Sequence, residues 1–419
     1  PAVDTIRTTY DNLGRIESVS QYQTDTSPPY NETLIDKVKL TYDGWGKITN
    51  FQQDWDSDIG ASGGMPTKSV NYTYERSTAG RTTVRRASMT WPGGDDLIYK
   101  YRSTGGRHDD AASRVSRLTL LNTTNDSELD IVDYEYLGED LVVRSESLQP
   151  AAYRQLYGST ATSFDDLDQF GRMTTDKWTR TTGYSGRPTI NFFEAAVAYD
   201  DNSNVTLTDD KVHSTKFDVR YDIDNLNRLQ RAQEGEWGGS SITQTRDEEW
   251  DLGQTGNWII HKLNLNGDSD YTDAGELDEN NPDTGTSGFN FNKANEQIGR
   301  NTDGSGGNEY TLTHDAVGNL TDDGKDYTYS YDVFGRLRAV YNKDSTPKLV
   351  AEYRYNGLGY RIGEHTDVAG SVSGVNGEPD GDVDDQDPWY FHVYDEKWRI
   401  VATYRVVKSG SAFTVDSNP

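Results

Sequence analysis

The chain has 419 residues and a formal net charge of −28, from 41 Lys and Arg against 69 Asp and Glu. A surface this negative repels a phosphate backbone, so we exclude a nucleic-acid partner and expect no binding to anionic membranes. The chain contains no Cys, which excludes disulfides and thiol chemistry, and no apolar run long enough to span a bilayer, so we expect no membrane insertion.

A seven-residue phrase first occurs at residues 10–16 and then recurs along the chain. It reads Tyr-Asp, two further residues, Gly, a basic residue and an aliphatic residue, and full copies return at residues 42–48 and 331–337. Looser copies begin at Tyr221, His314, Tyr355 and Tyr394. A unit that recurs at a period of a few tens of residues indicates a repeat architecture.

Each copy is predicted to form a β-hairpin. Alternation such as Tyr329-Ser330-Tyr331 places two aromatic side chains on one face of a strand. The Asp ends the strand because its carboxylate can accept backbone N–H groups two residues on, and the Gly supplies a positive φ. We therefore expect positive φ at Gly14, Gly46 and Gly335. The Arg that follows is expected to stack on a Tyr ring or to pair with an Asp of the neighbouring repeat.

The phrase resembles the YD repeats of the RHS family, found in bacterial wall-associated proteins, insecticidal toxin-complex shells and teneurins. The resemblance covers the chain from Tyr10 to about Arg405. It implies an all-β fold of antiparallel β-hairpins that wind into a spiral shell, a barrel or an elongated stalk. It also implies a role as container, adhesin or cell-surface stalk. The chain has no Asp-Pro-x-Gly motif, since Asp387-Pro388 is followed by Trp389, so the self-cleaving form of the family is not expected.

The organisation expected along the chain has four parts. Residues 1–263 form a YD-repeat array, residues 264–309 an insertion rich in Asp, Asn and Gly, residues 310–407 a second array with an acidic loop at 367–388, and residues 408–419 a tail or linker. Helix formers are sparse and no long stretch has a 3.6-residue period, so we expect little helix. Pro1 is not an initiator Met and no signal peptide is present, so we interpret the chain as processed or as a segment of a larger protein.

The acidic loop is a candidate calcium site. Counted from Asn376, oxygen-bearing side chains fall at positions 1, 3, 5, 7, 9 and 12, with Gly381 at position 6, as in an EF-hand loop. The segment resembles dockerin-type calcium loops, with Asp in place of the usual final Glu. The alternative interpretation is a solvated acidic insertion. The candidate ligands are Asn376, Glu378, Asp380, Asp382, Asp384 and Asp387.

A second candidate site lies in the 264–309 insertion, where four side chains could converge on one hard cation. A shifted register that starts at Asp268 would end at Glu279, and the sequence does not choose between the two. Ca²⁺ suits flexible carboxylate loops better than Mg²⁺, which requires a stricter octahedron, so Ca²⁺ is the cofactor considered at both sites. Here too, a solvated loop is the alternative. The candidate ligands are Asn266, Asp268, Asp270 and Glu276.

The sequence contains no convincing catalytic constellation. Residues 60–64, Gly-Ala-Ser-Gly-Gly, match a nucleophile-elbow string but lack its strand-to-helix context, and the 6 His have no metal-ligand spacing. We therefore expect a non-enzymatic structural or adhesive protein, outside a bacterium or on its surface, that contacts itself or neighbouring repeats of a larger chain. The alternatives are an RHS-type cocoon around a toxin and a surface whose exposed Tyr and Trp stack on cell-surface carbohydrate.

Overall fold

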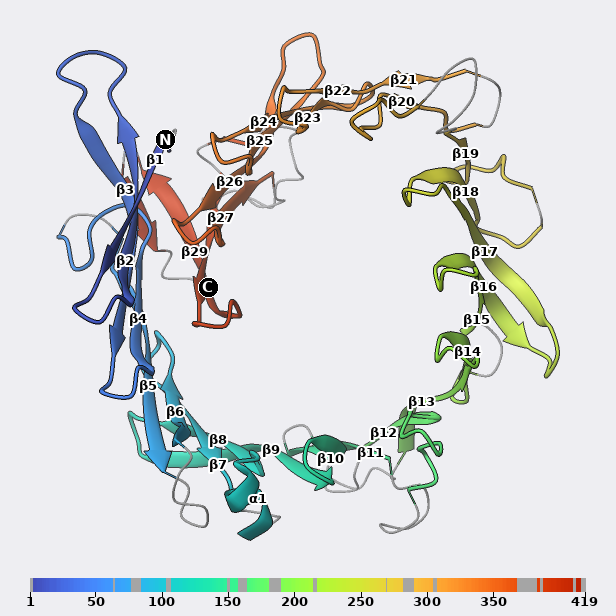
Figure 1. Ribbon diagram of the computed structural model, residues 1–419, viewed down its shortest axis with the longest axis horizontal. Coiled ribbons are helices and arrows are strands. Elements are labelled where there is room, and N and C mark those ends of the chain that lie inside the picture. The colour runs from blue at the N-terminus through green and yellow to red at the C-terminus, as the bar shows by residue number, and fades with distance from the viewer. Residues whose placement is uncertain are drawn as a thin grey trace.

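A computed structural model describes residues 3–62, 65–76, 84–102, 107–148, 151–156, 164–180, 190–213, 217–268, 270–281, 290–303, 307–367, 383–384, 387–409 and 412–415. The chain forms a strip of antiparallel strands that curls into a ring with an open centre (Figure 1). The helix in the described residues, α1 (Arg107–Ala112), is a short segment between two strands. The expected all-β repeat fold is confirmed.

The first part of the strip is a 19-stranded sheet, in which each strand pairs antiparallel with the next strand along the chain. Its strands are β1 (Thr5–Tyr10), β2 (Ile16–Thr24), β3 (Glu32–Tyr42), β4 (Ile48–Asp54), β5 (Lys68–Arg76), β6 (Val84–Thr90), β7 (Asp96–Lys100), β8 (Arg117–Asn122), β9 (Ser127–Leu137), β10 (Leu141–Leu148), β11 (Ala151–Gln155), β12 (Thr175–Arg180), β13 (Ile190–Tyr199), β14 (Val205–Asp210), β15 (Asp218–Ile223), β16 (Leu229–Trp237), β17 (Ile242–Leu252), β18 (Trp258–Asn264) and β19 (Leu277–Asn280).

A pair of short strands and a nine-stranded sheet complete the strip. The short pair is β20 (Gly299–Arg300) with β21 (Tyr310–Thr311). The last sheet comprises β22 (Thr313–His314), β23 (Leu320–Asp322), β24 (Tyr327–Tyr331), β25 (Leu337–Asn342), β26 (Leu349–Tyr355), β27 (Arg361–Thr366), β28 (Trp389–Tyr394), β29 (Ile400–Ser409) and β30 (Ala412–Val415).

The expected insertion and tail both contain strands that belong to the strip. Within residues 264–309, β19 pairs with β18, and the backbone N–H of Asn281 donates to Ile259 O at 2.6 Å. At the C-terminal end, β30 pairs with β29, with Val406 opposite Val415. Strand pairing therefore continues to Val415, beyond residue 407, where the tail or linker was expected to begin.

The turn at residues 10–16 explains why the phrase recurs. Asp11 Oδ1 accepts the backbone N–H groups of Leu13 at 2.8 Å and Arg15 at 2.9 Å, as in an Asx turn. Gly14 has a φ of +78°, and its N–H donates to Asp11 O at 3.0 Å. Tyr10 then pairs with Ile16 across a register shift, so each copy carries a β-bulge at its Tyr. Gly46 and Gly335 have φ values of +81° and +74°, which confirms the prediction for all three glycines.

The looser copy at Tyr221 was predicted in the wrong register. The turn is closed by Asp224, whose Oδ1 accepts the N–H of Leu226 and of Arg228 at 2.8 Å each, rather than by Asp222. A two-residue shift leaves every strand side chain on the same face. The alternation of side chains between the two strand faces could therefore not distinguish the two registers. By contrast, His314 pairs with Leu320 across a bulge and so occupies the Tyr position, as its copy of the phrase predicted.

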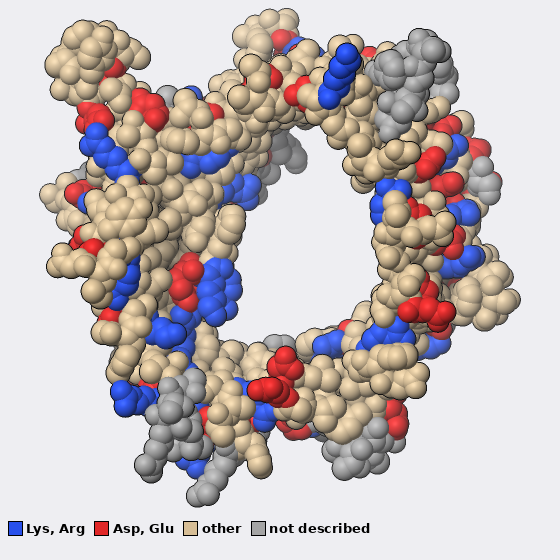
Figure 2. Space-filling view, in the orientation of Figure 1, with Lys and Arg blue, Asp and Glu red and all other residues tan. Residues whose placement is uncertain are grey.

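The two ends of the strip overlap, and the main hydrophobic core lies between them. In Figure 1, β26–β29 lie against β2–β5 on the inner side of the ring, and Figure 2 shows the open centre that remains. We call this overlap of β2–β6 with β26–β29 the closure seam. Its buried core consists of Val38, Leu40, Phe51, Trp55, Met65, Val70, Tyr72, Met89, Ile362, Trp389, Phe391, Val393, Tyr394 and Val406.

The glycine of the turn can be tested directly. Gly335→Val is expected to lower the free energy of unfolding by about 1–3 kcal/mol, because a β-branched residue is strained at a φ of +74°. An added Cβ would lie 3.6 Å from Asn319 Oδ1, an ordinary contact, so the backbone accounts for the cost. In the matched control, Gly44→Val, the glycine has no positive φ and an added Cβ meets nothing within 4 Å. Equal losses in chemical denaturation of the two variants would contradict this explanation.

Candidate functional site: the closure seam

Successive repeats are joined by contacts that use the Tyr and the Arg of the phrase. Tyr42 Oη donates to Ile16 O at 2.8 Å, and Tyr199 Oη donates to Met173 O at 2.8 Å. Between the same two repeats, the guanidinium of Arg15 lies 4.4 Å from the centre of the Tyr42 ring, as a cation–π contact. The predicted stacking of Arg on Tyr is therefore confirmed, and the hydroxyls of these half-buried tyrosines are satisfied.

The alternative to stacking, in which the Arg pairs with an Asp of the neighbouring repeat, is not adopted at these turns. Arg15 Nε lies 2.6 Å from Oδ2 of Asp11, the Asp of its own turn, and Arg336 Nε lies 2.6 Å from Asp332 Oδ2. The turn itself brings the guanidinium over its carboxylate, since the two residues are four apart. Arg15 reaches the neighbouring repeat through the backbone, where its Nη1 donates to Asp43 O at 3.2 Å.

At the closure seam, polar side chains of the first strands bond to the backbone of the last ones. Gln21 Nε2 donates to Tyr355 O at 2.6 Å, across 334 residues of sequence. Gln53 Nε2 donates to Tyr394 O at 3.0 Å, across 341 residues. Because both amides are buried, these bonds also fix how the two sheets align.

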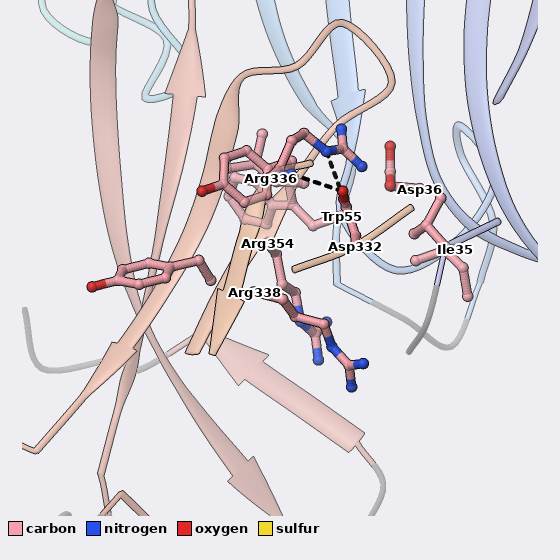
Figure 3. A pocket seen from close by; sticks show the side chains of 11 residues that line it. Ile35, Asp36, Trp55, Asp332, Arg336, Arg338 and Arg354 are labelled. Atoms are coloured by element: carbon pink, nitrogen blue, oxygen red, sulfur yellow. Dashed lines mark hydrogen bonds and ion pairs between the residues drawn. The ribbon is translucent and has the colours of Figure 1, made fainter. Parts of the chain in front are cut away.

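A buried carboxyl lies at the centre of the seam. Asp36 is 2 % exposed and lines a cavity of about 30 Å³ together with Arg336 and Arg354 (Figure 3). Burial raises the pKa of Asp36 well above its usual value, and the positive charges of Arg336 and Arg354 oppose that shift. A cavity of this size has room for about one water molecule.

A mostly buried ion pair crosses the seam elsewhere, between β6 and the turn that joins β28 to β29. Arg86 Nη2 contacts Glu396 Oε1, with side-chain exposures of 13 % and 11 %. The Arg86 guanidinium also lies 4.3 Å from the centre of the Tyr72 ring, and Tyr72 Oη accepts the backbone N–H of Glu396 at 3.2 Å. Burial alone would lower the pKa of Arg86, but its hydrogen bonds to Glu396 and Tyr74 raise it above its usual value.

Most of the first predicted calcium site lies outside the described residues, namely Asn376, Glu378, Asp380 and Asp382. Asp384 and Asp387 are described, and the backbone N–H of Asp384 donates to Asp387 Oδ2 at 3.0 Å. His365 Nε2 lies 3.1 Å from Asp387 O, so Asp387 belongs to the edge of the seam. Calcium binding by this loop stays a prediction.

In the second predicted calcium site, the side chains close a loop by hydrogen bonds. Asn266 Nδ2 donates to Asp268 Oδ2 at 3.1 Å, and Glu276 Oε1 accepts the backbone N–H of Leu265 at 2.8 Å. The N–H of Asp270, which donates to Asp268 Oδ1 at 3.0 Å, lowers the pKa of Asp268. Within the described residues, no group of three or more His, Asp or Glu side chains could hold a metal ion, and calcium binding here also stays a prediction.

The seam was not predicted from the sequence. The sequence feature that marks the seam is a Gln at an inward-facing strand position, two residues after a buried apolar residue. Gln21 follows Val19 in this way, and Gln53 follows Phe51, and all four side chains are buried. A buried amide must find a partner, so such a Gln indicates a face that packs on another backbone.

Comparison with solved structures finds the same fold in longer chains. The chain aligns with TcdB2-TccC3 over 100% of its length, at a TM-score of 0.55 and 12% identity, and with TcdB2-TccC3 lacking its hypervariable C-terminal region at 0.54 and 13%. It also aligns over 98% of its length with the Photorhabdus luminescens Tc holotoxin pore, at 0.53 and 12%. The chain shares their fold.

These chains are much longer, and the present chain spans 22% to 23% of their length. No protein-family model matches the sequence, and no curated protein matches it. Among the residues that the structure describes, no helix has the length and apolar character needed to cross a membrane.

Proposed function

We propose that the chain forms a turn of the wall of a hollow β-hairpin shell, which acts as a container, as in the cocoon alternative drawn from the sequence. The observation that carries this proposal is the closure seam, because a strip that packs on its own start encloses a space. The similarity to TcdB2-TccC3 over the full chain also favours a container over an adhesive fibre. A wall segment requires no catalytic residue, and adhesion and an extracellular location stay predictions.

The hairpin turns also support a wall in which the strip winds around more than once. In six of them, the residue two positions after the Asp is apolar and exposed. In the Asn356 turn, the equivalent residue, Leu358, packs against the core of the seam. This edge of the strip can therefore pack on a strip face, and a further turn of strip would cover the other six. They are Leu13, Trp45, Phe170, Leu226, Val317 and Phe334.

A disulfide across the seam tests the container against the fibre. A Cβ added at Gly357 would lie 3.4 Å from Val19 Cβ, close to the separation of about 3.5–4.5 Å in a disulfide. The chain has no Cys of its own, so in Val19→Cys/Gly357→Cys only the two introduced thiols can react. We expect mild oxidation to give an intramolecular disulfide, seen as faster migration of a monomer on a non-reducing gel.

The single variant Val19→Cys is the control and should give no fast-migrating monomer. Electron microscopy of the oxidised double variant should show rings with an open centre. Disulfide-linked multimers, or rods and fibres, would instead support an open strip that pairs between molecules and would overturn the container proposal.

A further inference from the structure

A cleft of about 500 Å³ opens beside the closure seam, where the turn between β28 and β29 meets β5–β7. We call it the seam cleft. Its walls carry Lys47, from the turn between β3 and β4, and Lys397, from the turn between β28 and β29. Tyr74 and Tyr99 also line it. The cleft therefore exists only when the two ends of the strip are packed together.

Lys47 differs from the residue at the same position in the preceding repeat. In the turn before it, Arg15 pairs with its own Asp and lies 4.4 Å from the centre of the next Tyr ring, that of Tyr42. A lysine lacks the planar guanidinium with which Arg15 both pairs with its Asp and stacks on the next Tyr ring. Lys47 accordingly makes no ion pair and no ring contact with Tyr74 among the described residues, so its ammonium group is available to a ligand. The Tyr74 hydroxyl still donates to Ile48 O at 2.8 Å, and the Arg86 guanidinium lies 6.0 Å from the centre of the Tyr74 ring.

The other charged groups of the cleft are already paired. Glu396 contacts Arg86, and Arg399 Nε lies 2.6 Å from Oδ2 of the fully buried Asp395. Arg85, the remaining cation, lies 2.7 Å from carboxylate oxygens of both Glu75 and Asp110.

Lys397, like Lys47, is exposed and makes no ion pair in the described part of the chain. The lining of the seam cleft therefore includes two lysines without an ion pair, in a chain whose net charge is −28.

This combination of charge, rings and size selects a class of ligand. Two ammonium groups favour an anion, and a carboxylate accepts hydrogen bonds from both. The half-buried rings of Tyr74 and Tyr99, each with its centre 6.0 Å from the Arg86 guanidinium, provide apolar surface on which a sugar ring can pack. A volume of about 500 Å³ lies within the range of small-molecule sites.

We propose that the seam cleft binds a carboxylate carried on a sugar-sized ring. Lys47 and Lys397 hold the carboxylate, and Tyr74 and Tyr99 contact the ring. This inference goes beyond the shell proposal and depends only on the closed seam. The same carboxylate could come from an acidic sugar or from a simple organic acid, and the ligands of the test separate these two sources.

The test is a calorimetric titration of the intact chain at low ionic strength with glucuronate, glucose and acetate. We expect glucuronate to bind, and acetate and glucose to bind at least tenfold more weakly. Equal binding of glucuronate and acetate would retain the carboxylate site and assign it to simple acids. No binding of either acid, or equal binding of glucose and glucuronate, would overturn the proposal.

The variant Lys47→Gln/Lys397→Gln should weaken glucuronate binding at least tenfold and leave the melting temperature unchanged, because both side chains are exposed. The matched control, Lys293→Gln/Lys325→Gln, removes the same charge from exposed positions that do not line the cleft. An equal loss of affinity in the two variants would show a general effect of net charge and overturn the assignment to the seam cleft. If oxidised Val19→Cys/Gly357→Cys closes the ring but binds no acid, only this inference fails.

Discussion

Trp55→Ala is expected to lower the free energy of unfolding by about 3–5 kcal/mol, the usual cost of removing a large side chain from a packed core. Trp55 is 2 % exposed, and its ring centre lies 5.0 Å from that of Phe391 and 5.9 Å from that of Tyr404. The lost stability should come from the packing of the two strip ends rather than from any single hairpin. Chemical denaturation measures the energy, and small-angle scattering should show the opened ring as a larger radius of gyration.

The matched control is Trp45→Ala, since Trp45 is 61 % exposed and its ring contact is with Arg76, at 5.2 Å. An exposed cation–π contact contributes about 0.5–1 kcal/mol, so the control should stay within that range. If the two variants lose equal stability, or if Trp55→Ala keeps the radius of the closed ring, then the seam is not what closes the strip.

Glu396→Ala is expected to cost about 3–5 kcal/mol, because it leaves Arg86 buried without its partner. The side chain of Arg86 is 13 % exposed and its Nε has no hydrogen-bond partner among the described residues, so most of the guanidinium would lie buried without a carboxylate. The loss should appear as a lower melting temperature and as a lower midpoint in chemical denaturation.

The double variant Arg86→Met/Glu396→Leu separates the cost of an orphaned charge from the net value of the pair. A buried ion pair contributes little compared with apolar side chains of similar size, so the double variant should recover most of the loss. If it is less stable than Glu396→Ala, the ion pair itself stabilises the seam and the explanation by an orphaned charge is wrong.

The hairpins could be predicted from the sequence because every step of the turn is local. An Asp accepts N–H groups two and four residues on, a Gly takes the positive φ, and both lie within the same seven residues, as Asp11 and Gly14 do. The register was predicted wrongly at Tyr221, where the phrase is degenerate, because a two-residue shift leaves every strand side chain on the same face. Local rules therefore determined the strip almost completely.

The closure of the strip could not be predicted in the same way. Alternation shows that Val19 and Gln21 share a strand face, but it does not show which distant backbone that face meets. The partners of Gln21 and Gln53 lie 334 and 341 residues away. Only curvature summed over the intervening strands brings them together, and no short motif encodes that sum.

The separation between local pairing and distant closure determines how the chain folds. Every strand pairing within the two large sheets joins sequence neighbours, so each hairpin can form on its own within microseconds, and hairpins can add to one another in any order. The seam has the opposite character, since its contacts span more than 300 residues and require the intervening strip to be in place. Closing so long a loop costs only logarithmically more than closing a short one. Ring closure is then the last step of folding and the first to reverse, and a denaturant should open the ring before it melts the strands.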